Sequence, residues 1–344
     1  MNKYDERYNF RKAKVNDLDR LMKFIREYWR ADHILGNDRE FFTYEHGDGE
    51  NINFILCEDK KDHEIVGMQG FIPYSKNEDL LHICGVMTMV KKDVDIPMLG
   101  VELMTRFKDM MQYKTFCGLG TNPKTMVPIA KRFFHRYVGK MEHYYRLNST
   151  INKFKIAKIV NRKMTEFASG DNNQVKMVEF KKFDEVKASL ELNKSYRQLP
   201  YKEDWYIEKR YFDHPVYHYR AFGIMVDATA KAILLGRQVK HEGTKILRFV
   251  DFIGNVEDMT LAEKGIRNII EEEGYEYADF ILHGVPESIM NKIGFVRKRE
   301  EDSNVIPNYF EPFVQSNVDI WFEASEEDLI LFRADADGDR PNMR

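Results

Sequence analysis

The chain has 344 residues, of which 43% are apolar and 32% charged, and its formal net charge at pH 7 is −3. This composition is that of an ordinary globular protein with enough material for two hydrophobic cores, and it lacks the basic excess of a general nucleic-acid-binding protein. No apolar run is long enough to span a membrane, and the charged N-terminus has no signal-peptide core. We therefore expect a cytoplasmic protein with no nucleic-acid partner and no membrane association.

The three cysteines, Cys57, Cys84 and Cys117, lie in apolar stretches that look like buried strands. Their spacing is not that of a metal site, and a reducing compartment keeps such core thiols free. The sequence predicts no metal.

The first half of the chain predicts strands and helices in a defined order. Expected strands are residues 10–15, 53–57, 65–73 and 82–90. A helix follows the capping pair Asn16 and Asp17, and another starts at Pro97, which suits a first helical turn. A last helix is expected to run from the region of Asn122 to about Lys140.

The second half repeats this order after a polar connection at residues 149–173. Expected strands are residues 177–180, 231–238, 246–253 and 277–282, and expected helices cover residues 259–272 and end again near Lys292. A period of roughly 155 residues indicates two related domains rather than a solenoid. We expect an α+β protein with domains at 1–150 and 175–344, a connection at 151–174, and in each domain a mixed, mostly antiparallel sheet flanked by helices.

Three short motifs carry a family resemblance. They are the opening Phe10 to Ala13 with Asp17, the stretch from Asn122 through Ala130 to Gly139, and Lys292 to Phe295 in the second copy. In this order the chain resembles a tandem Gcn5-related N-acetyltransferase (GNAT). The resemblance implies an acyl-coenzyme A co-substrate whose pantetheine arm pairs with an exposed strand edge and whose pyrophosphate binds a helix N-terminus. An amine then attacks the thioester carbonyl.

The resemblance also indicates which copy binds coenzyme A. Gly100 matches the last glycine of the family's pyrophosphate loop, although Met98 replaces the first glycine and Asp95 stands where Gln or Arg is usual. The corresponding residues 255–260 are acidic and would repel a pyrophosphate. The first copy is therefore the expected cofactor site. The implied contacts are Thr88, Val90, Lys91, Lys92, Gly100 and Asn122. As an alternative, the two lysines form a solvated turn.

His135 is the candidate acid or base. Many GNAT members have a Tyr four residues before the glycine that ends the late helix, and counting back from Gly139 gives His135. Histidine titrates near neutral pH and can exchange protons there. An exposed structural histidine and attack without a dedicated base both stay open, and His33 and His82 are further candidates that also suit structural roles.

Two segments resemble enzymes that acylate the amino group of a dTDP-linked 3-amino- or 4-amino-6-deoxyhexose in bacterial lipopolysaccharide or capsule biosynthesis. One is the C-terminal stretch 330–342, and the other is the aromatic stretch 205–219. The implied substrate contacts are Tyr217, Tyr219, Asp339, Arg340 and Asn342. Otherwise the acidic end is a solubilising tail and the aromatic residues fill a core.

The expected function is therefore an N-acyltransferase that moves an acetyl or short hydroxyacyl group from acyl-coenzyme A to a nucleotide-linked amino sugar. Two alternatives stay open. One is transfer to another small amine or a peptidoglycan precursor, and the other is a non-catalytic acyl-coenzyme A sensor. The oligomeric state is open as well.

Overall fold

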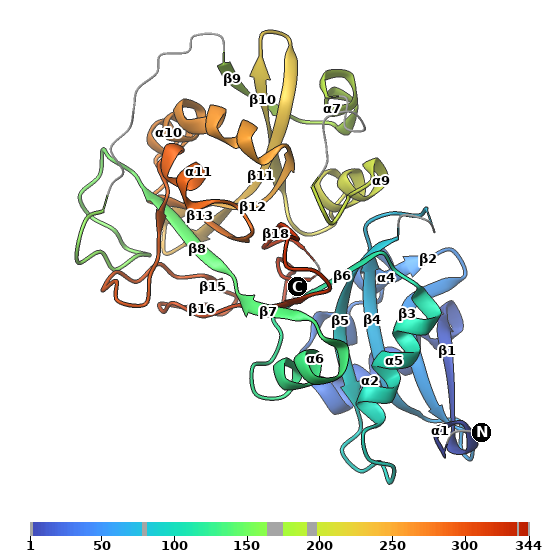
Figure 1. Ribbon diagram of the computed structural model, residues 1–344. Helices are drawn as coiled ribbons and strands as arrows, with labels where there is room; N and C mark the ends of the chain where they lie inside the picture. The colour runs from blue at the N-terminus through green and yellow to red at the C-terminus, as the bar shows by residue number, and fades with distance from the viewer. Residues whose placement is uncertain (1–2, 78–80, 164–174, 191–197, 336, 343–344) are drawn as a thin grey trace. The chain divides into compact units, whose positions relative to one another are not determined.

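The computed structural model describes residues 3–77, 81–163, 175–190, 198–335 and 337–342, and the chain forms two compact units (Figure 1). The first unit contains residues 1–138, 322–327 and 336–344, and the second contains residues 139–321 and 328–335. The expected domain boundaries follow the sequence repeat, whereas contacts assign residues 139–150 to the second unit. The chain therefore passes between the units more than once.

The first sheet runs in the order β1-β3-β4-β5-β6-β17-β7, with β2 beside β3. Its strands are β1 (Tyr8–Lys14), β2 (Gly47–Asp48), β3 (Asn51–Asp59), β4 (Ile65–Pro73), β5 (His82–Val90), β6 (Thr115–Leu119), β7 (Tyr137–Lys140) and β17 (Trp321–Ala324). Neighbouring strands from β1 to β5 are antiparallel, and β5 and β6 are parallel.

Helices pack on both faces of this sheet. They are α1 (Lys3–Arg7), α2 (Leu18–Phe24), α3 (Ile34–Asn37), α4 (Arg39–His46), α5 (Leu99–Met111) and α6 (Met126–Phe134). On one face Phe107 of α5 packs against Phe71 of β4, with ring centroids 5.7 Å apart. On the other, Phe42 of α4 packs against Phe54 of β3 at 5.5 Å. Alternate side chains of each strand therefore enter two apolar layers.

The second sheet runs in the order β14-β8-β13-β12-β11-β10-β9, with β18 beside β13 (Figure 1). Its strands are β8 (Glu142–Leu147), β9 (Val175–Phe180), β10 (Tyr219–Val226), β11 (Thr229–His241), β12 (Thr244–Gly254), β13 (Tyr277–His283), β14 (Val296–Arg297) and β18 (Leu331–Phe332). A separate small hairpin joins β15 (Tyr309–Phe310) and β16 (Phe313–Val314).

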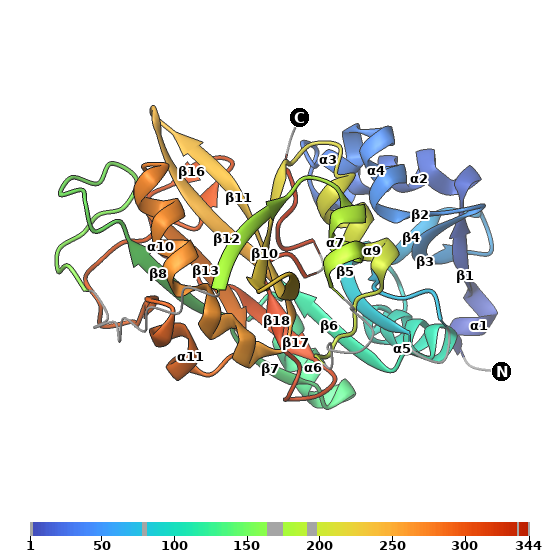
Figure 2. The same ribbon diagram turned by 90° about the horizontal axis from the view of Figure 1, so that it is seen from above.

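The helices of the second unit also cover both faces of their sheet. Helices α10 (Glu263–Glu272) and α11 (Glu287–Lys292) share one core with the sheet (Figure 2). Helices α7 (Phe183–Ser189) and α9 (Asp204–Ile207) contribute to the core on the other face. As in the first sheet, one central strand pair, β12 and β13, is parallel. The expected α+β class, with two mixed, mostly antiparallel sheets flanked by helices, is thus confirmed.

Several local expectations hold and one is wrong. The β3–β4 and β11–β12 hairpins form as expected, and the three cysteines are buried thiols that form no disulfide within the described residues. The helix expected to continue to about Lys140 instead ends at Phe134, and residues 137–140 form β7. Among the described residues, no helix combines the length and apolarity that crossing a bilayer requires.

Candidate functional site

The central parallel strands of the first sheet separate after three residue pairs. Strand β5 pairs with β6 only at His82, Ile83 and Cys84. On its other side, β5 carries a bulge, because Met68 pairs with Met89 and Gly70 with Val86, so that the single residue between them, Gln69, faces two. A bulge takes backbone groups out of the ladder. Beyond Cys84, β5 has no further strand partner on its β6-facing edge among the described residues.

The bulge is built around one residue of β5. Met87 has φ = +47°, in the left-handed region that non-glycine residues seldom adopt. Such conformations concentrate at binding and catalytic sites, where the rest of the fold enforces them. The distortion thus lies at the point where the two parallel strands part.

The second sheet has the same opening, but the chain itself fills it. Strands β12 and β13 pair only over residues 247–249 and 278–280, and Val250 is the bulged residue of β12. Residues 331–335, which we call the inserted segment, enter between them. The amide of Ala334 donates to the carbonyl of Val250 at 2.9 Å, and that of Arg333 donates to Ile281 at 3.0 Å.

A buried charge cluster fixes the inserted segment. The Lys202 ammonium, 1% exposed, lies 2.6 Å from Asp251 Oδ2 and 2.8 Å from Asp335 Oδ1. The Tyr211 hydroxyl also donates to Asp251, and the Phe332 amide donates to Asp335 Oδ2 at 2.7 Å. Burial raises the pKa of Asp251, and the Lys202 charge opposes that rise. One cation thus holds two buried carboxylates, one of them from the C-terminal end of the chain.

The loop before α5 (Leu99–Met111) contains a left-handed residue. Met98, immediately before α5, has φ = +66°, so it adopts the conformation for which a glycine is the usual choice. The Tyr4 hydroxyl donates to the Pro97 carbonyl at 2.9 Å, and Arg7 lies 3.5 Å from Asp95, whose charge it partly neutralises. Amides of the first turn of a helix have no intrahelical acceptor and favour anions.

Comparisons with known proteins bear on this arrangement. No protein-family model matches the chain, and no curated protein matches its sequence. A GCN5-related N-acetyltransferase from Anabaena variabilis ATCC 29413 aligns over 92% of this chain and 72% of its own, with a TM-score of 0.54 and 9% identity. A conserved protein from Enterococcus faecalis V583, described as a probable N-acyltransferase, aligns over 92% of this chain and 71% of its own, with a TM-score of 0.57 and 7% identity.

The chain has the tandem GNAT-like fold. Both alignments span both units of the chain. At 9% and 7% sequence identity they show a shared fold and do not extend to activity or substrate. In GNAT terms, β5 and β6 are the parting strands of the first copy, and β12 and β13 are those of the second.

The residues expected to contact coenzyme A lie along the open edge of the first copy and after it. Thr88 lies in the bulge on β5 and Val90 follows it, and a Cβ at Gly100 would have only Val90 Cγ2 within 4 Å, at 3.8 Å. The Lys91 ammonium forms a salt bridge with Glu64 at 2.8 Å, which partly neutralises its charge, whereas Lys92 is exposed. Their role toward coenzyme A stays a prediction.

Asn122 follows β6 and organises the start of α6. Its Oδ1 accepts hydrogen bonds from the amides of Lys124 and Thr125, and its carbonyl accepts from Met126 and Val127. This local use explains an asparagine here without a ligand, and any contact with coenzyme A stays a prediction.

His135 does not lie on a helix. It is exposed and has φ = +51°, which ends α6 one residue earlier. Arg136 then turns inward, where it stacks on Phe116 at 3.7 Å and pairs with Glu323 of β17 at 2.8 Å. This buried pair draws the chain into β7, and it is the physical reason why the helix does not continue to Gly139. The acid–base role of His135 stays a prediction. The helical spacing between His135 and Gly139, on which that prediction was based, is absent because α6 ends at Phe134.

The other two candidate histidines are buried. Burial lowers the pKa of His82 to about 4, and its Nδ1 lies 2.7 Å from the Thr115 hydroxyl. Burial, with a smaller contribution from Arg340, lowers the pKa of His33 to about 3, and its Nδ1 accepts a hydrogen bond from the Leu35 amide. Both are therefore neutral at pH 7 and have structural contacts.

The aromatic segment serves partly as core and partly as an aromatic platform. Tyr206 and Tyr211 are buried, as the structural alternative expected. Tyr217 is stacked on His214 with 12° between the rings, and Arg237 lies 3.9 Å from its ring centroid. Tyr219 begins β10. Tyr217 and Tyr219 are half-buried, His214 and Arg237 are buried, and all four belong to the second unit.

The other expected substrate contacts belong to the first unit. Asp339 is 1% exposed, and Arg340 pairs with Asp337 at 2.8 Å. Pro341 is buried and Asn342 is half-buried. The described part of this terminus is thus packed, in contrast to the alternative of a loose solubilising tail. A substrate role for these residues stays a prediction.

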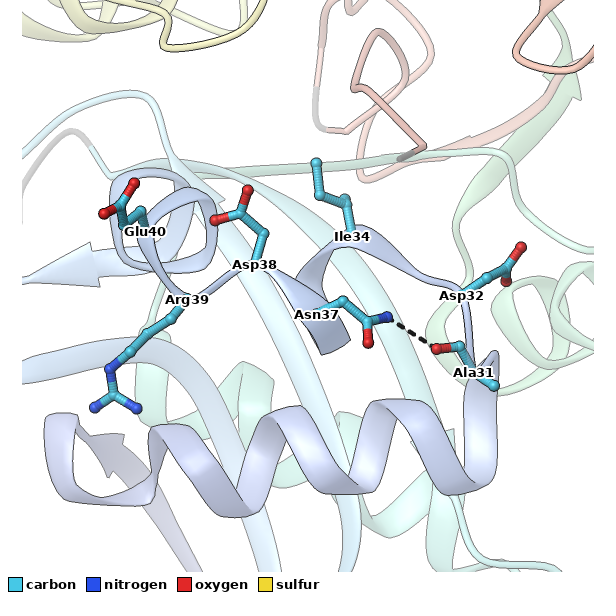
Figure 3. A pocket seen from close by; sticks show the side chains of 7 residues that line it. All are labelled: Ala31, Asp32, Ile34, Asn37, Asp38, Arg39 and Glu40. Carbon is cyan, nitrogen blue, oxygen red and sulfur yellow. Dashed lines mark hydrogen bonds between the residues drawn. The ribbon is translucent and has the colours of Figure 1, made fainter. Parts of the chain in front are cut away.

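An open hollow of about 670 Å³ lies near the start of α3 and α4 in the first unit (Figure 3). Its lining residues include Asp32, Asp38 and Glu40 as well as Arg39, so acidic side chains outnumber basic ones in the lining. None of the residues expected from the sequence lines it. Within the described ranges, no group of three or more His, Cys, Asp or Glu side chains could hold a metal ion.

Neither the buried cluster nor the bulge was predicted from the sequence, although a single polar residue marks each of them. Asp251 interrupts the apolar run of β12, and Gln69 interrupts that of β4. A polar side chain within a strand that is otherwise apolar needs a buried partner or a function. Lys202 carries no such signal, because its place in the fold is not visible in its local sequence.

Proposed function

We propose that this protein is a coenzyme A-dependent N-acyltransferase that binds its acyl donor in the first copy. The observation that carries this proposal is the contrast between the two sheets. The β6-facing edge of β5 is open past Cys84, while the inserted segment occupies the same place in the second sheet. An extended pantetheine arm can hydrogen-bond along an open strand edge as an added strand does.

The loop before α5 supports the same assignment. Met98 keeps the left-handed turn, and no side chain at Gly100 covers the first helical turn. A pyrophosphate is stabilised at such a terminus. The turn before α10 carries Glu257 and Asp258 instead, and these charges disfavour an anion.

The chemistry would proceed by direct acyl transfer. The acceptor nitrogen attacks the thioester carbonyl, a C–N bond forms, the C–S bond breaks, and the nitrogen loses a proton as the thiol of coenzyme A is released. Bulge amides near Met87 and Thr88 lie outside the ladder and can donate to the developing oxyanion. In this proposal Thr88 and Val90 hold the arm, Lys91, Lys92, Gly100 and Asn122 lie toward the pyrophosphate end, and His135 moves a proton.

For the acceptor we propose the amino group of a dTDP-linked amino-deoxyhexose. This rests on the resemblance of stretches 205–219 and 330–342, and the packed terminus around Asp339 and the Tyr217–Arg237 platform are compatible with it. Aromatic rings can stack on a base or sugar, and guanidinium groups bind phosphates.

The test is a thiol-release assay that crosses several acyl-coenzyme A donors with dTDP- and UDP-amino sugars and with peptidyl amines. We expect release of free thiol only when an amino sugar is present. Turnover with peptidyl amines alone would refute the sugar assignment. One molecule of acyl-coenzyme A bound per chain without turnover on any amine would favour the sensor instead, and two molecules bound per chain would refute the contrast between the copies.

A further inference from the structure

A hollow of about 300 Å³ lies in the second unit, and the proposed function uses none of the residues that line it. It is bounded by the end of β8, by helix α10 and by the residues after α11. Three cations, one carboxylate and one hydroxyl are among its lining side chains, those of Arg146, Lys163, Arg267, Glu271 and Ser149. Positive charges therefore outnumber negative ones in the lining, and we call this site the basic hollow.

The basic hollow lies at the far end of β13 from the inserted segment. Leu147, which lines the hollow, pairs with Tyr277 at the start of β13. The inserted segment instead pairs with Leu282 and His283 at the end of that strand. The hollow is therefore separate from the opening of the second sheet, and it belongs to a different unit from the proposed coenzyme A site.

Side-chain hydrogen bonds hold the wall of the hollow that follows β8. Asn148 Nδ2 donates to the carbonyls of Ile270 and Tyr275 at 3.1 and 2.9 Å, which ties the end of β8 to the end of α10. The Arg162 guanidinium donates to the carbonyls of Asn148 and Ser149 at 2.8 and 2.9 Å. The backbone around Ser149 is therefore fixed in advance, which reduces the entropy lost when a small molecule binds beside it.

The two guanidinium groups of the hollow share one carboxylate oxygen. Arg146 is 5% exposed, and its Nη2 lies 2.9 Å from Glu263 Oε1. The same oxygen lies 3.7 Å from Arg267 Nε. Burial lowers the pKa of Arg146, and the positive charge of Arg267 adds to this effect. The two nearby glutamates, Glu263 and Glu271, oppose the shift without cancelling it, so a further negative charge would stabilise the buried cation.

One donor of the hollow lacks an acceptor. Within the described ranges, Arg267 Nε is buried and forms no hydrogen bond. A buried donor without an acceptor costs free energy, and an anionic oxygen in the hollow would offset that cost. The third cation, Lys163, lies 3.3 Å from the buried Asp302, and its side chain is 40% exposed, so its ammonium is able to turn toward a bound anion.

We propose that the basic hollow binds the phosphate group of a small molecule. A guanidinium presents its N–H donors in a planar fork that matches phosphate oxygens, and a lysine adds a mobile point charge. The volume of the hollow is at the lower end of the range for small-molecule sites, so it suits a compact phosphorylated compound. This binding does not involve acyl transfer, so it stands or falls separately from the proposed function.

The test titrates the full chain with inorganic phosphate by calorimetry, with the ionic strength kept constant by chloride. Arg267→Met should weaken phosphate binding about ten-fold or more, because it removes charge-assisted hydrogen bonds. Glu271→Gln removes the negative charge from the lining and should tighten binding. Hydrogen exchange locates the site, since phosphate should slow the exchange of amides in residues 146–149 and 267–271 of the wild type.

Lys240→Met is the matched control, because Lys240 is an exposed cation of the same unit outside the hollow, and its loss should leave phosphate binding unchanged. Thermal unfolding checks that each variant is folded. If Arg267→Met does not fold, Arg267→Lys takes its place and should also weaken binding, since it loses the planar fork. Equal phosphate affinity in the wild type and both hollow variants would overturn the proposal, as would the absence of saturable binding. Tighter binding of succinate than of phosphate would overturn the assignment to a phosphate group.

Discussion

Removing the charge of Lys202 should free the inserted segment. Lys202→Met leaves Asp251 and Asp335, both fully buried, without the cation that lies 2.6 and 2.8 Å from them. Breaking a buried ion pair from one side typically costs about 3–5 kcal/mol, since the remaining charge is uncompensated. Two carboxylates share this cation, so we expect a loss at the upper end of that range.

Hydrogen exchange at two amides reports this loss directly. The Phe332 amide donates to Asp335, and the Ala334 amide donates to Val250. If their exchange requires the segment to leave the sheet, a loss of about 3–5 kcal/mol accelerates it by roughly 10²- to 4 × 10³-fold, at about 1.4 kcal/mol for each factor of ten. Lys187→Met is the control, because Lys187 forms an exposed pair with Asp184 and its loss should change little.

The sign of the pH dependence gives a second check. Burial already raises the pKa of Asp251 above its ordinary value. Without Lys202 that pKa rises further, and a carboxyl with a raised folded-state pKa becomes more stabilising as the pH falls through it. The loss of stability that Lys202→Met causes, relative to the wild type, should therefore be smaller at pH 5 than at pH 7.5. Wild-type exchange rates in the variant at pH 7.5 would refute the role of the cluster.

Four further outcomes are expected. Gly100→Asp should weaken acyl-coenzyme A binding at least ten-fold by calorimetry, because its charge meets the pyrophosphate, whereas Gly100→Ala should bind nearly normally, as only Val90 Cγ2 lies near. His135→Ala should lower kcat by about 10²- to 10⁴-fold with both KM values within a few-fold if it transfers a proton, and an unchanged kcat would return it to a structural role. Deleting residues 336–344 should lower activity on the amino sugar, and wild-type kinetics together with an unchanged melting temperature would show the end to be dispensable. The folded-state pKa of His82, about 4, lies below the ordinary 6.5, so the unfolded chain takes up a proton first as the pH falls. About 3 kcal/mol of stability should therefore be lost between pH 6.5 and pH 4. His82→Gln should make the free energy of urea unfolding less dependent on pH in this range.

The repeat and the periodicity of the sequence were enough to predict the α+β class and the β3–β4 and β11–β12 hairpins, because hairpin strands pair with their neighbours in the chain. They did not predict where each sheet ends. Strand β17 pairs with β6 from a distance of about 200 residues, with Ala324 opposite Cys117. Likewise, the end of α6 depends on the Arg136–Glu323 pair, which no local pattern around His135 reveals.

The candidate site was predictable to a similar degree. The resemblance pointed to Gly100 and to the strand after Val86, because the motif is local, and their role toward coenzyme A stays a prediction. Met98 was misleading. A methionine in place of the motif's first glycine suggested that the left-handed turn was lost, but the Met98 backbone keeps that conformation. The Lys202 cluster could not be predicted from the sequence, because Lys202, Asp251 and Asp335 lie far apart in the chain.

The membership of β17 and the C-terminal residues in the first unit has a consequence for how the chain is made. When the ribosome has released residues 1–138, β6 still lacks the strand that will cover its outer edge, because residues 322–324 have not been translated. At about 5–20 residues per second, that edge is exposed for on the order of ten seconds or more. Bare strand edges template pairing with other chains. A chaperone that binds the nascent chain should therefore raise the yield of this protein most during translation of its second half, and a chain truncated near residue 150 should aggregate rather than fold.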